Sequence, residues 1–190
     1  ALVVAIIPAT MHLLSTWATL NATQREAGGI APASALLRTV QVVQQHRGLS
    51  ALALGGQPAS EAPREAKQRE VDEVVASTQA VAARMFGGSQ LRSSWERSRG
   101  QWTQLRDRVA TRSITPAESF VAHTALVALL LETIEQTSDE FGLTLDPRMD
   151  SYKLILATTA TLPVLTEELG KSRAKGAAML ATKARSDSDK

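Results

Sequence analysis

The chain has 190 residues, and its 21 Lys and Arg against 19 Asp and Glu give a formal net charge of only +2, which argues against a dedicated nucleic-acid-binding protein with a strong basic excess on one face. Cysteine is absent, which excludes a disulfide scaffold, a cysteine-based zinc site and a thiol nucleophile. Aromatic residues make up 4% of the chain and apolar residues, chiefly Ala, Leu and Val, make up 44%, a composition that favours helix–helix packing over β-sheet.

The N-terminal segment is uncharged. Residues 1–24 contain no Asp, Glu, Lys or Arg, and the first charged side chain is Arg25. A helix needs roughly 20 mostly apolar residues to cross a membrane, and Trp17 lies where an interfacial aromatic anchor is common. We therefore predict an N-terminal transmembrane helix over residues 1–24. A cleaved signal peptide and a buried helix of a soluble bundle are the two alternatives.

Glycine and proline clusters divide the rest of the chain into five helical segments. These clusters lie at residues 28–32, 55–63, 87–88, 113–116 and 142–147. Between them apolar residues recur every three or four positions, and no segment alternates with a period of two. Because short loops join antiparallel neighbours, we predict an all-α, up-and-down helical bundle over residues 25–170. Residues 171–190 are expected to begin a further helix.

The spacing within the segments predicts which side chains are buried. Trp95 and Trp102 lie seven residues apart on one face and are expected in the core. In the last segment the expected stripe is Tyr152, Ile155, Thr159, Leu162, Thr166 and Leu169. Pro163 lies inside that helix and is expected to kink it, or to end it after Thr161. Residues 115–118 combine a capping box with a proline at the first helical position.

The sequence contains no recognisable catalytic arrangement. Residues 170–172 match the end of a phosphate-binding loop, but Leu165 stands where its first glycine belongs. The three histidines, His12, His46 and His123, show no i, i+4 pair that would suit a metal ion. No nucleophile, base and oxyanion donor come together in any motif. We therefore expect no enzymatic activity in this chain, and neither a cofactor nor a metal site.

Four polar residues are candidates for a ligand site. Arg47 lies on the apolar stripe of its segment, where a guanidinium must be paired, exposed at the edge of the helix seam or bound to an anion. Arginine suits bidentate recognition of carboxylates and oxyanions, although a side chain that reaches solvent at the seam edge is the simpler alternative. Gln44, His123 and Tyr152 are the other candidates. For His123, a core or ligand-facing position is favoured over a phosphate-accepting one.

Two stretches of the chain resemble a known bacterial group. They are VVQQHRGLSALALGG at residues 42–56 and LDPRMDSYKLILATTATLPVLTEELGKSRAKGAAM at residues 145–179. The chain resembles the extracytoplasmic sensory region of methyl-accepting chemotaxis receptors and sensor histidine kinases, and in part the nitrate- and nitrite-sensing helical bundles. In the nitrate-sensing relatives an arginine that corresponds to Arg47 helps to bind the anion. Those relatives usually carry an acidic residue where His46 stands.

The resemblance implies the signal-input domain of a transmembrane receptor. Residues 25–190 would be periplasmic, anchored in the bacterial inner membrane, with a second transmembrane helix and a signalling module after Lys190. The implied partners are a small anionic ligand or a periplasmic binding protein, and a second copy in a homodimer, with no nucleic acid. Binding would be transmitted as a small helix shift across the membrane. Two alternatives stay open: a membrane-tethered structural or protein-interaction bundle without signalling, and a cytoplasmic phosphotransfer bundle with an exposed His123.

Overall fold

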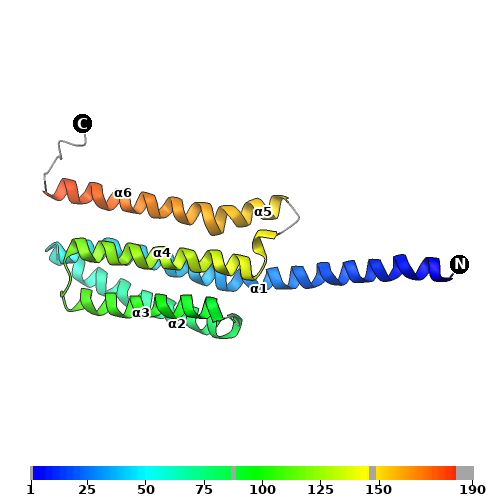
Figure 1. Cartoon of the computed structure of the whole chain (residues 1–190). Coiled ribbons are helices and arrows are strands. Elements are labelled where there is room, and N and C mark those ends of the chain that lie inside the picture. The colour runs from blue at the N-terminus through cyan, green and yellow to red at the C-terminus, as the bar shows by residue number, and fades with distance from the viewer. Residues whose placement is uncertain (1, 87–88, 146–148, 183–190) are drawn as a thin grey trace.

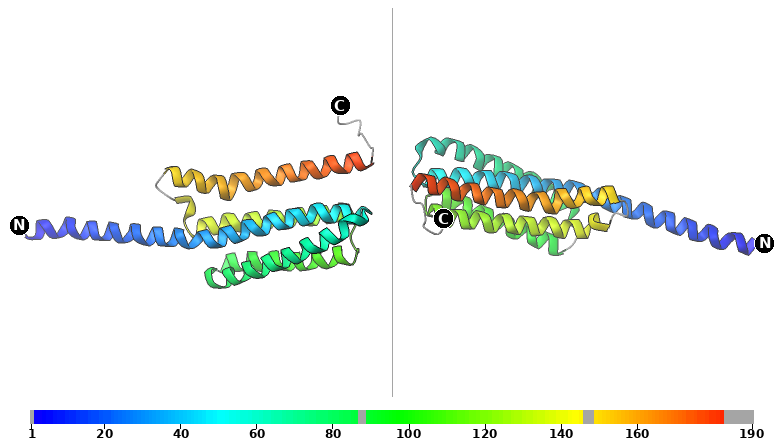
Figure 2. Two further views of the ribbon diagram at one scale, coloured as in Figure 1. Left: turned by 180° about the vertical axis from the view of Figure 1, so that it is seen from behind. Right: turned by 90° about the horizontal axis from the view of Figure 1, so that it is seen from above.

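Helical rods run back and forth along one common axis, each antiparallel to the one before it in the chain (Figures 1 and 2). The computed structural model describes residues 2–86, 89–145 and 149–182. A π-helical turn, Ala157–Thr161, joins the last two helices into one rod, and short 3-10 turns lie at Pro58–Ser60 and Leu143–Leu145. The helices are α1 (Leu2–Leu54), α2 (Glu61–Met85), α3 (Ser89–Ala110), α4 (Pro116–Glu140), α5 (Met149–Leu156) and α6 (Leu162–Thr182). The prediction of an all-α helical bundle is confirmed, while the predicted breaks at 87–88 and at 146–147 lie outside the described residues.

The longest helix, α1, passes unbroken through residues 28–32, where we predicted an interruption, so that prediction is wrong. A Cβ atom on Gly29 would lie 2.5 Å from the Cβ atom of Phe141. The glycine therefore allows α1 to approach the end of α4 closely, and it does not end the helix. Arg25 strengthens the same crossing, because its Nε donates a hydrogen bond to the carbonyl oxygen of Glu140 over 2.8 Å.

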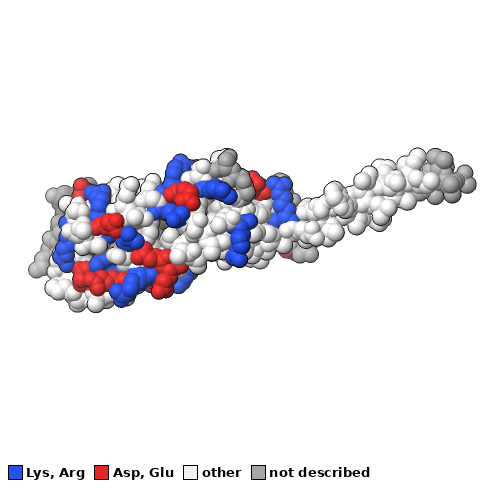
Figure 3. Space-filling model, turned by 90° about the horizontal axis from the view of Figure 1, so that it is seen from below, with Lys and Arg blue, Asp and Glu red and all other residues white. Residues whose placement is uncertain are grey.

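Residues 2–24 of α1, called here the N-terminal arm, project beyond the bundle as an isolated helix (Figure 1). Its large apolar side chains from Ile6 to Leu20 are between 50% and 67% exposed. No charged side chain interrupts the arm where it is drawn in Figure 3, whereas the bundle carries both signs of charge. Among the described residues one helix, α4, is long and apolar enough to span a membrane, and 39% of its apolar window is buried in the bundle.

The hydrophobic core is formed by side chains of α1 to α4. Val43 of α1 and the two tryptophans of α3 are among its buried members. The indole N–H of Trp95 donates to Gln79 over 2.6 Å, and that of Trp102 donates to Asp72 over 2.8 Å. Both tryptophans therefore fill the core, as predicted, and satisfy their polar atoms at its edge.

Helix α4 begins with the predicted capping box. The Oγ1 atom of Thr115 accepts a hydrogen bond from the backbone N–H of Glu118, and the Glu118 carboxylate accepts one from the backbone N–H of Thr115 over 2.9 Å. Pro116 occupies the first helical position. The cap fixes the start of the helix that carries three of the polar residues described below.

The buried face of the last rod differs from the prediction by one residue. Leu162, Thr166 and Leu169 are exposed, whereas Pro163 and Glu167 are buried. The cause is the π-helical turn directly before Pro163, since a π-turn contains one more residue than an α-turn and shifts the face that follows. The α-helix resumes at Leu162 after the π-helical turn, so Pro163 lies in the first turn of α6 and does not end the rod after Thr161. Residues 171–182 continue α6 and do not begin a separate helix; residues 183–190 lie outside the described part.

Candidate functional site

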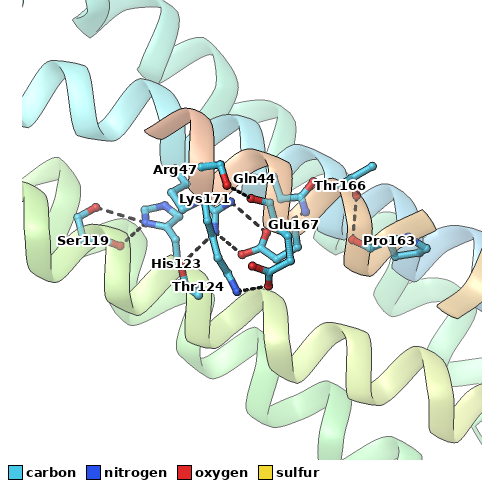
Figure 4. A network of polar contacts seen from close by, with 11 residues as sticks. Gln44, Arg47, Ser119, His123, Thr124, Pro163, Thr166, Glu167 and Lys171 are labelled. Atoms are coloured by element: carbon cyan, nitrogen blue, oxygen red, sulfur yellow. Dashed lines mark hydrogen bonds and ion pairs between the residues drawn. The ribbon is translucent and has the colours of Figure 1, made fainter. Parts of the chain in front are cut away.

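Arg47 of α1 is buried and paired with a carboxylate from α6 (Figure 4). The exposed fraction is 3% for Arg47 and 4% for Glu167. Nη1 of Arg47 donates to Oε1 of Glu167 over 2.6 Å, and Nη2 donates to Oε2 over 3.0 Å. Two parallel charge-assisted hydrogen bonds of this kind are the strongest and most direction-specific contact that a guanidinium makes.

Neighbouring side chains complete this ion pair. The Nε2 atom of Gln44 donates to Oε2 of Glu167 over 3.0 Å, and Nη1 of Arg47 also donates to Oγ1 of Thr124 on α4 over 3.0 Å. The guanidinium carbon lies 5.2 Å from the centre of the Phe120 ring. These five residues, called here the Arg47 cluster, join three helices that are far apart in the sequence.

The ion pair depends on a close approach of α6 to α1. A Cβ atom on Gly170 would lie 3.0 Å from Nη2 of Arg47, which is tighter than an ordinary contact. Gly170 follows Glu167 by one helical turn and is partly buried on the same face of α6. Because Gly170 has no side chain, the Arg47 guanidinium has room beneath α6.

A pair of buried histidines lies beside the Arg47 cluster. His46 and His123 are both 0% exposed, and Nδ1 of His46 lies 2.8 Å from Nε2 of His123. Nδ1 of His123 lies 2.7 Å from the carbonyl oxygen of Ser119, which accepts only. Nδ1 of His123 therefore carries a proton. With both rings neutral, Nε2 of His123 accepts and Nδ1 of His46 donates, and this arrangement satisfies both contacts.

Burial explains why these rings stay neutral. Desolvation, together with the nearby His123 and the Arg64 guanidinium, lowers the pKa of His46 to about 3. Desolvation also lowers the pKa of His123 to about 4, against a hydrogen bond to the Ser119 carbonyl that raises it and the Arg47 charge that lowers it. A ring without solvent access has no route to a phosphoryl donor, so this burial opposes the phosphotransfer alternative.

The chemistry of the Arg47 cluster is that of a planar-anion site. The guanidinium fork and an amide N–H₂ converge on one carboxylate, and the guanidinium also donates to the Thr124 hydroxyl. The directed hydrogen bonds of the cluster hold the negative charge of Glu167 in a fixed position against the guanidinium. Among the described residues, no three His, Asp or Glu side chains gather closely enough to hold a metal ion.

The structure brings together some of the four predicted site residues. Arg47 and Gln44 belong to the Arg47 cluster, and His123 lies close enough to Arg47 for the guanidinium to lower its pKa. Tyr152 lies on α5, on the other side of the π-helical turn from the cluster. The simpler alternative for Arg47, a charged end that reaches solvent, is wrong because the whole side chain is buried.

Sequence reasoning missed Glu167 and Thr124. The predicted stripe does not contain Glu167, because a regular helix places Thr166 on the inner face and the apolar spacing does not show the shift produced by the π-turn. The sequence offers one indication of its burial: Glu167 lies four residues after Pro163, on the same face of the helix, and the structure buries both. Thr124 follows the predicted His123 directly and carried no signal of its own.

Comparison with known proteins gives one match. A family model described as "Nitrate and nitrite sensing" matches residues 38–190, which include α2 to α6 and the bundle part of α1 that carries Arg47. No curated protein and no solved structure matches the chain.

Proposed function

Since the chain belongs to the nitrate and nitrite sensing family, we propose that it is the ligand-sensing input domain of a transmembrane receptor and that the Arg47 cluster recognises nitrate or nitrite. One observation carries this proposal: a buried arginine already binds a planar, negatively charged group through both of its terminal nitrogens. Nitrate is planar and presents two oxygens side by side, as a carboxylate does, so the same fork of donors fits it.

Glu167 occupies the position that the ligand needs. An incoming anion must replace the carboxylate at Arg47, because two negative groups do not share one buried guanidinium. The displaced Glu167 regains water only if α6 moves away from α1, which takes its charge out of the interior. Helix α6 is well suited to move, because Glu167 and Pro163 are its two fully buried side chains in the described part of α6.

Movement of α6 reaches α1 directly. Arg47 is part of α1, and α1 is continuous from Leu2 to Leu54, so a change in the contact between α1 and α6 acts on the same helix that forms the N-terminal arm. Packed helices shift between discrete positions by an ångström or two. We propose that such a shift of α1 is the output of the domain.

The N-terminal arm supports a membrane anchor. It is uncharged and projects from the bundle with its apolar side chains exposed. An isolated helix of this kind has a stable environment in a lipid bilayer. We propose that the arm spans the bacterial inner membrane and that residues 25–190 lie in the periplasm, with no enzymatic activity of their own. Burial of Arg47 favours a small ligand over a periplasmic binding protein, because a protein surface does not reach a guanidinium that is 3% exposed.

Nitrate binding to the purified full chain, measured by calorimetry, tests this function. We expect Arg47→Gln to weaken nitrate binding at least tenfold, since it removes the charged fork. Glu167→Ala should instead bind nitrate more tightly than the parent chain, because the competing carboxylate is gone. Glu168→Ala is the matched control, since Glu168 is the exposed neighbour of Glu167 on α6 and should leave the affinity unchanged.

Chloride, titrated at the same concentrations, is the ligand control, because a spherical ion cannot offer a separate acceptor atom to each of the two terminal nitrogens. Nitrate binding that is equal in the parent chain and in Arg47→Gln would exclude the Arg47 cluster as the site. The absence of nitrate and nitrite binding in every variant, including Glu167→Ala, would reject the proposed ligand.

A further inference from the structure

The rod of α5 and α6 contains two alternative inner faces that differ by one residue. Before the π-helical turn, the inner face consists of three partly buried side chains: Tyr152, Ile155 and Thr159. A regular α-helix continues this spacing of three and four through three residues that the structure exposes: Leu162, Thr166 and Leu169. Because the π-turn contains one extra residue, α6 instead places the residue after each of these against the bundle. Those residues are Pro163, Glu167 and Gly170.

Loss of the π-turn would exchange one inner face for the other. Each residue of α6 would take the place of the residue that follows it, in what we call the slipped register. The change amounts to a rotation of about 100° and a slide of about 1.5 Å along the helix axis. Glu167 would then take the exposed place of Glu168.

Opposing contacts balance the two registers. Leu162 and Leu169 are 49% and 60% exposed in the structure, and both would turn toward the bundle in the slipped register. Burial of leucine side chains favours that register. The ion pair between Arg47 and Glu167 favours the observed one. A group that competes for Arg47 therefore shifts the balance toward the slipped register.

Thr166 is the residue that the slip brings to Arg47. It is exposed in the structure, and its Oγ1 donates a hydrogen bond to the carbonyl oxygen of Pro163 over 2.8 Å (Figure 4). In the slipped register it would take the place of Glu167. The threonine side chain is shorter than that of glutamate and carries no charge, so it leaves the guanidinium fork open and adds a hydroxyl donor beside it.

We propose that Thr166 is a further ligand residue, and that nitrate binds the slipped register, in which the Thr166 hydroxyl and the Arg47 guanidinium hold the anion together. The inference rests on the proposed function and states how Glu167 leaves the site. Leu169, in the place of Gly170, also holds α6 farther from α1. Even a Cβ atom on Gly170 would lie 3.0 Å from Nη2 of Arg47, and a leucine side chain is larger.

Thiol labelling tests the two registers without any ligand, because the chain has no native cysteine. Leu169→Cys reports the slip. Val164→Cys is the matched control, since position 164 is 51% exposed and the slip moves it to the place of Leu165, which is 50% exposed. We expect Glu167→Ala to slow maleimide labelling of Leu169→Cys about fivefold, because a buried thiol reacts only after local opening. Labelling of Val164→Cys should not change.

Deletion of Ala160 distinguishes a slip from a general tightening of the bundle. It removes the extra residue of the π-turn, so a regular helix then keeps position 167 on the inner face and Leu169 outside. In the Glu167→Ala chain this deletion should restore fast labelling of Leu169→Cys. A labelling rate of Leu169→Cys that does not respond to Glu167→Ala, or equal slowing at positions 164 and 169, would overturn the two registers.

Calorimetry with nitrate tests the ligand contact. Thr166→Val replaces the hydroxyl by a methyl group and should weaken nitrate binding about tenfold, since it removes a hydrogen bond to a charged group. Ser172→Ala is the control, because it removes a hydroxyl from a position of α6 that is exposed in both registers. Deletion of Ala160 should also weaken binding, because it holds Glu167 inward.

The outcomes separate this inference from the proposed function. Nitrate binding that equals that of the parent chain in both Thr166→Val and the Ala160 deletion would overturn the inference and leave the proposed function intact. Absence of nitrate binding in the parent chain and in Glu167→Ala would reject the proposed function and, with it, the ligand role of Thr166. The labelling rates would still decide whether α6 has one register or two.

Discussion

The ion pair of Arg47 and Glu167 is stabilising only when it is complete. Both groups are buried, so each has lost most of its hydration and depends on the other for compensation. In the proposed function, the same dependence makes the pair a switch, because an anion that satisfies Arg47 releases Glu167. Two partly buried side chains add to this compensation, because the Thr124 hydroxyl accepts from Arg47 and the Gln44 amide donates to Glu167.

Removal of one partner should destabilise the bundle strongly. We expect Arg47→Met or Glu167→Met alone to lower the free energy of unfolding by about 3–5 kcal/mol, since each leaves an uncompensated buried charge. The double replacement by Met should recover most of this loss. Urea unfolding of the four chains measures the effect, with Arg38→Ala at a largely exposed ion pair as the control that should change little. A double variant as unstable as the sum of the singles would contradict this account.

The histidine pair should make the bundle sensitive to acid. The pKa values of His46 and His123 in the folded chain are lowered to about 3 and about 4, so both rings stay neutral there. In the unfolded chain both rings take up a proton below pH 6.5, the ordinary pKa of histidine. Stability is therefore full above pH 6.5 and falls as the pH is lowered toward 4. Each ring contributes a slope that approaches about 1.4 kcal/mol per pH unit.

Urea unfolding between pH 7.5 and pH 4.5 tests this dependence. His123→Gln, which keeps a polar side chain without a titrating ring, should show a shallower fall than the parent chain. The same slope in both proteins would mean that carboxylates, and not the buried rings, cause the loss of stability in acid.

Residue chemistry made part of the site predictable. An arginine on an apolar stripe is rarely without a function or a partner, and this alone identified Arg47, with Gln44 one helical turn before it. Its partner could not be found in the same way. Glutamate is common on exposed helix faces, and Glu167 is buried only because of a local change in helix type.

At the scale of the elements, two helices decide how the site works. Helix α1 is one rod although its sequence contains two glycines and a proline in five residues, and it packs there against the end of α4. In α6 the π-turn rotates the chain so that Glu167 faces Arg47. Local propensity predicted a break in the first case and the wrong face in the second, since neither effect is a property of the segment alone.

The crossing of α1 and α4 gives a prediction at this scale. Gly29→Ala places a methyl group 2.5 Å from the Cβ atom of Phe141, so the two helices must separate. We expect a loss of about 1–3 kcal/mol in the free energy of unfolding, in the range of overpacked cores. Gly48→Ala on the same helix meets no neighbour within 4 Å and is the control; it should be neutral or slightly stabilising. Equal effects of the two substitutions would show that the close approach is not required.

For the molecule as a whole, the sequence predicted the helical bundle and the burial of Trp95 and Trp102 because apolar spacing and turn residues act locally and agree with each other. It did not predict which helices exchange polar contacts. The Arg47 cluster connects residues more than a hundred positions apart, and such pairs depend on the register of packed helices. In the proposed function, the Glu167 carboxylate closes the bundle, and an external planar anion that replaces it opens the bundle.

The displacement of α6 by nitrate is the central claim, and a distance measurement tests it directly. Spin labels at Thr103→Cys on α3 and Val164→Cys on α6, both exposed positions, report the separation of α6 from the bundle in a chain without other cysteines. Labelled chain is diluted with unlabelled chain so that only distances within one copy are seen. We predict that nitrate lengthens this distance in the parent chain, and that Glu167→Ala shows the longer distance without nitrate. Nitrate that binds while the distance stays the same would contradict the account.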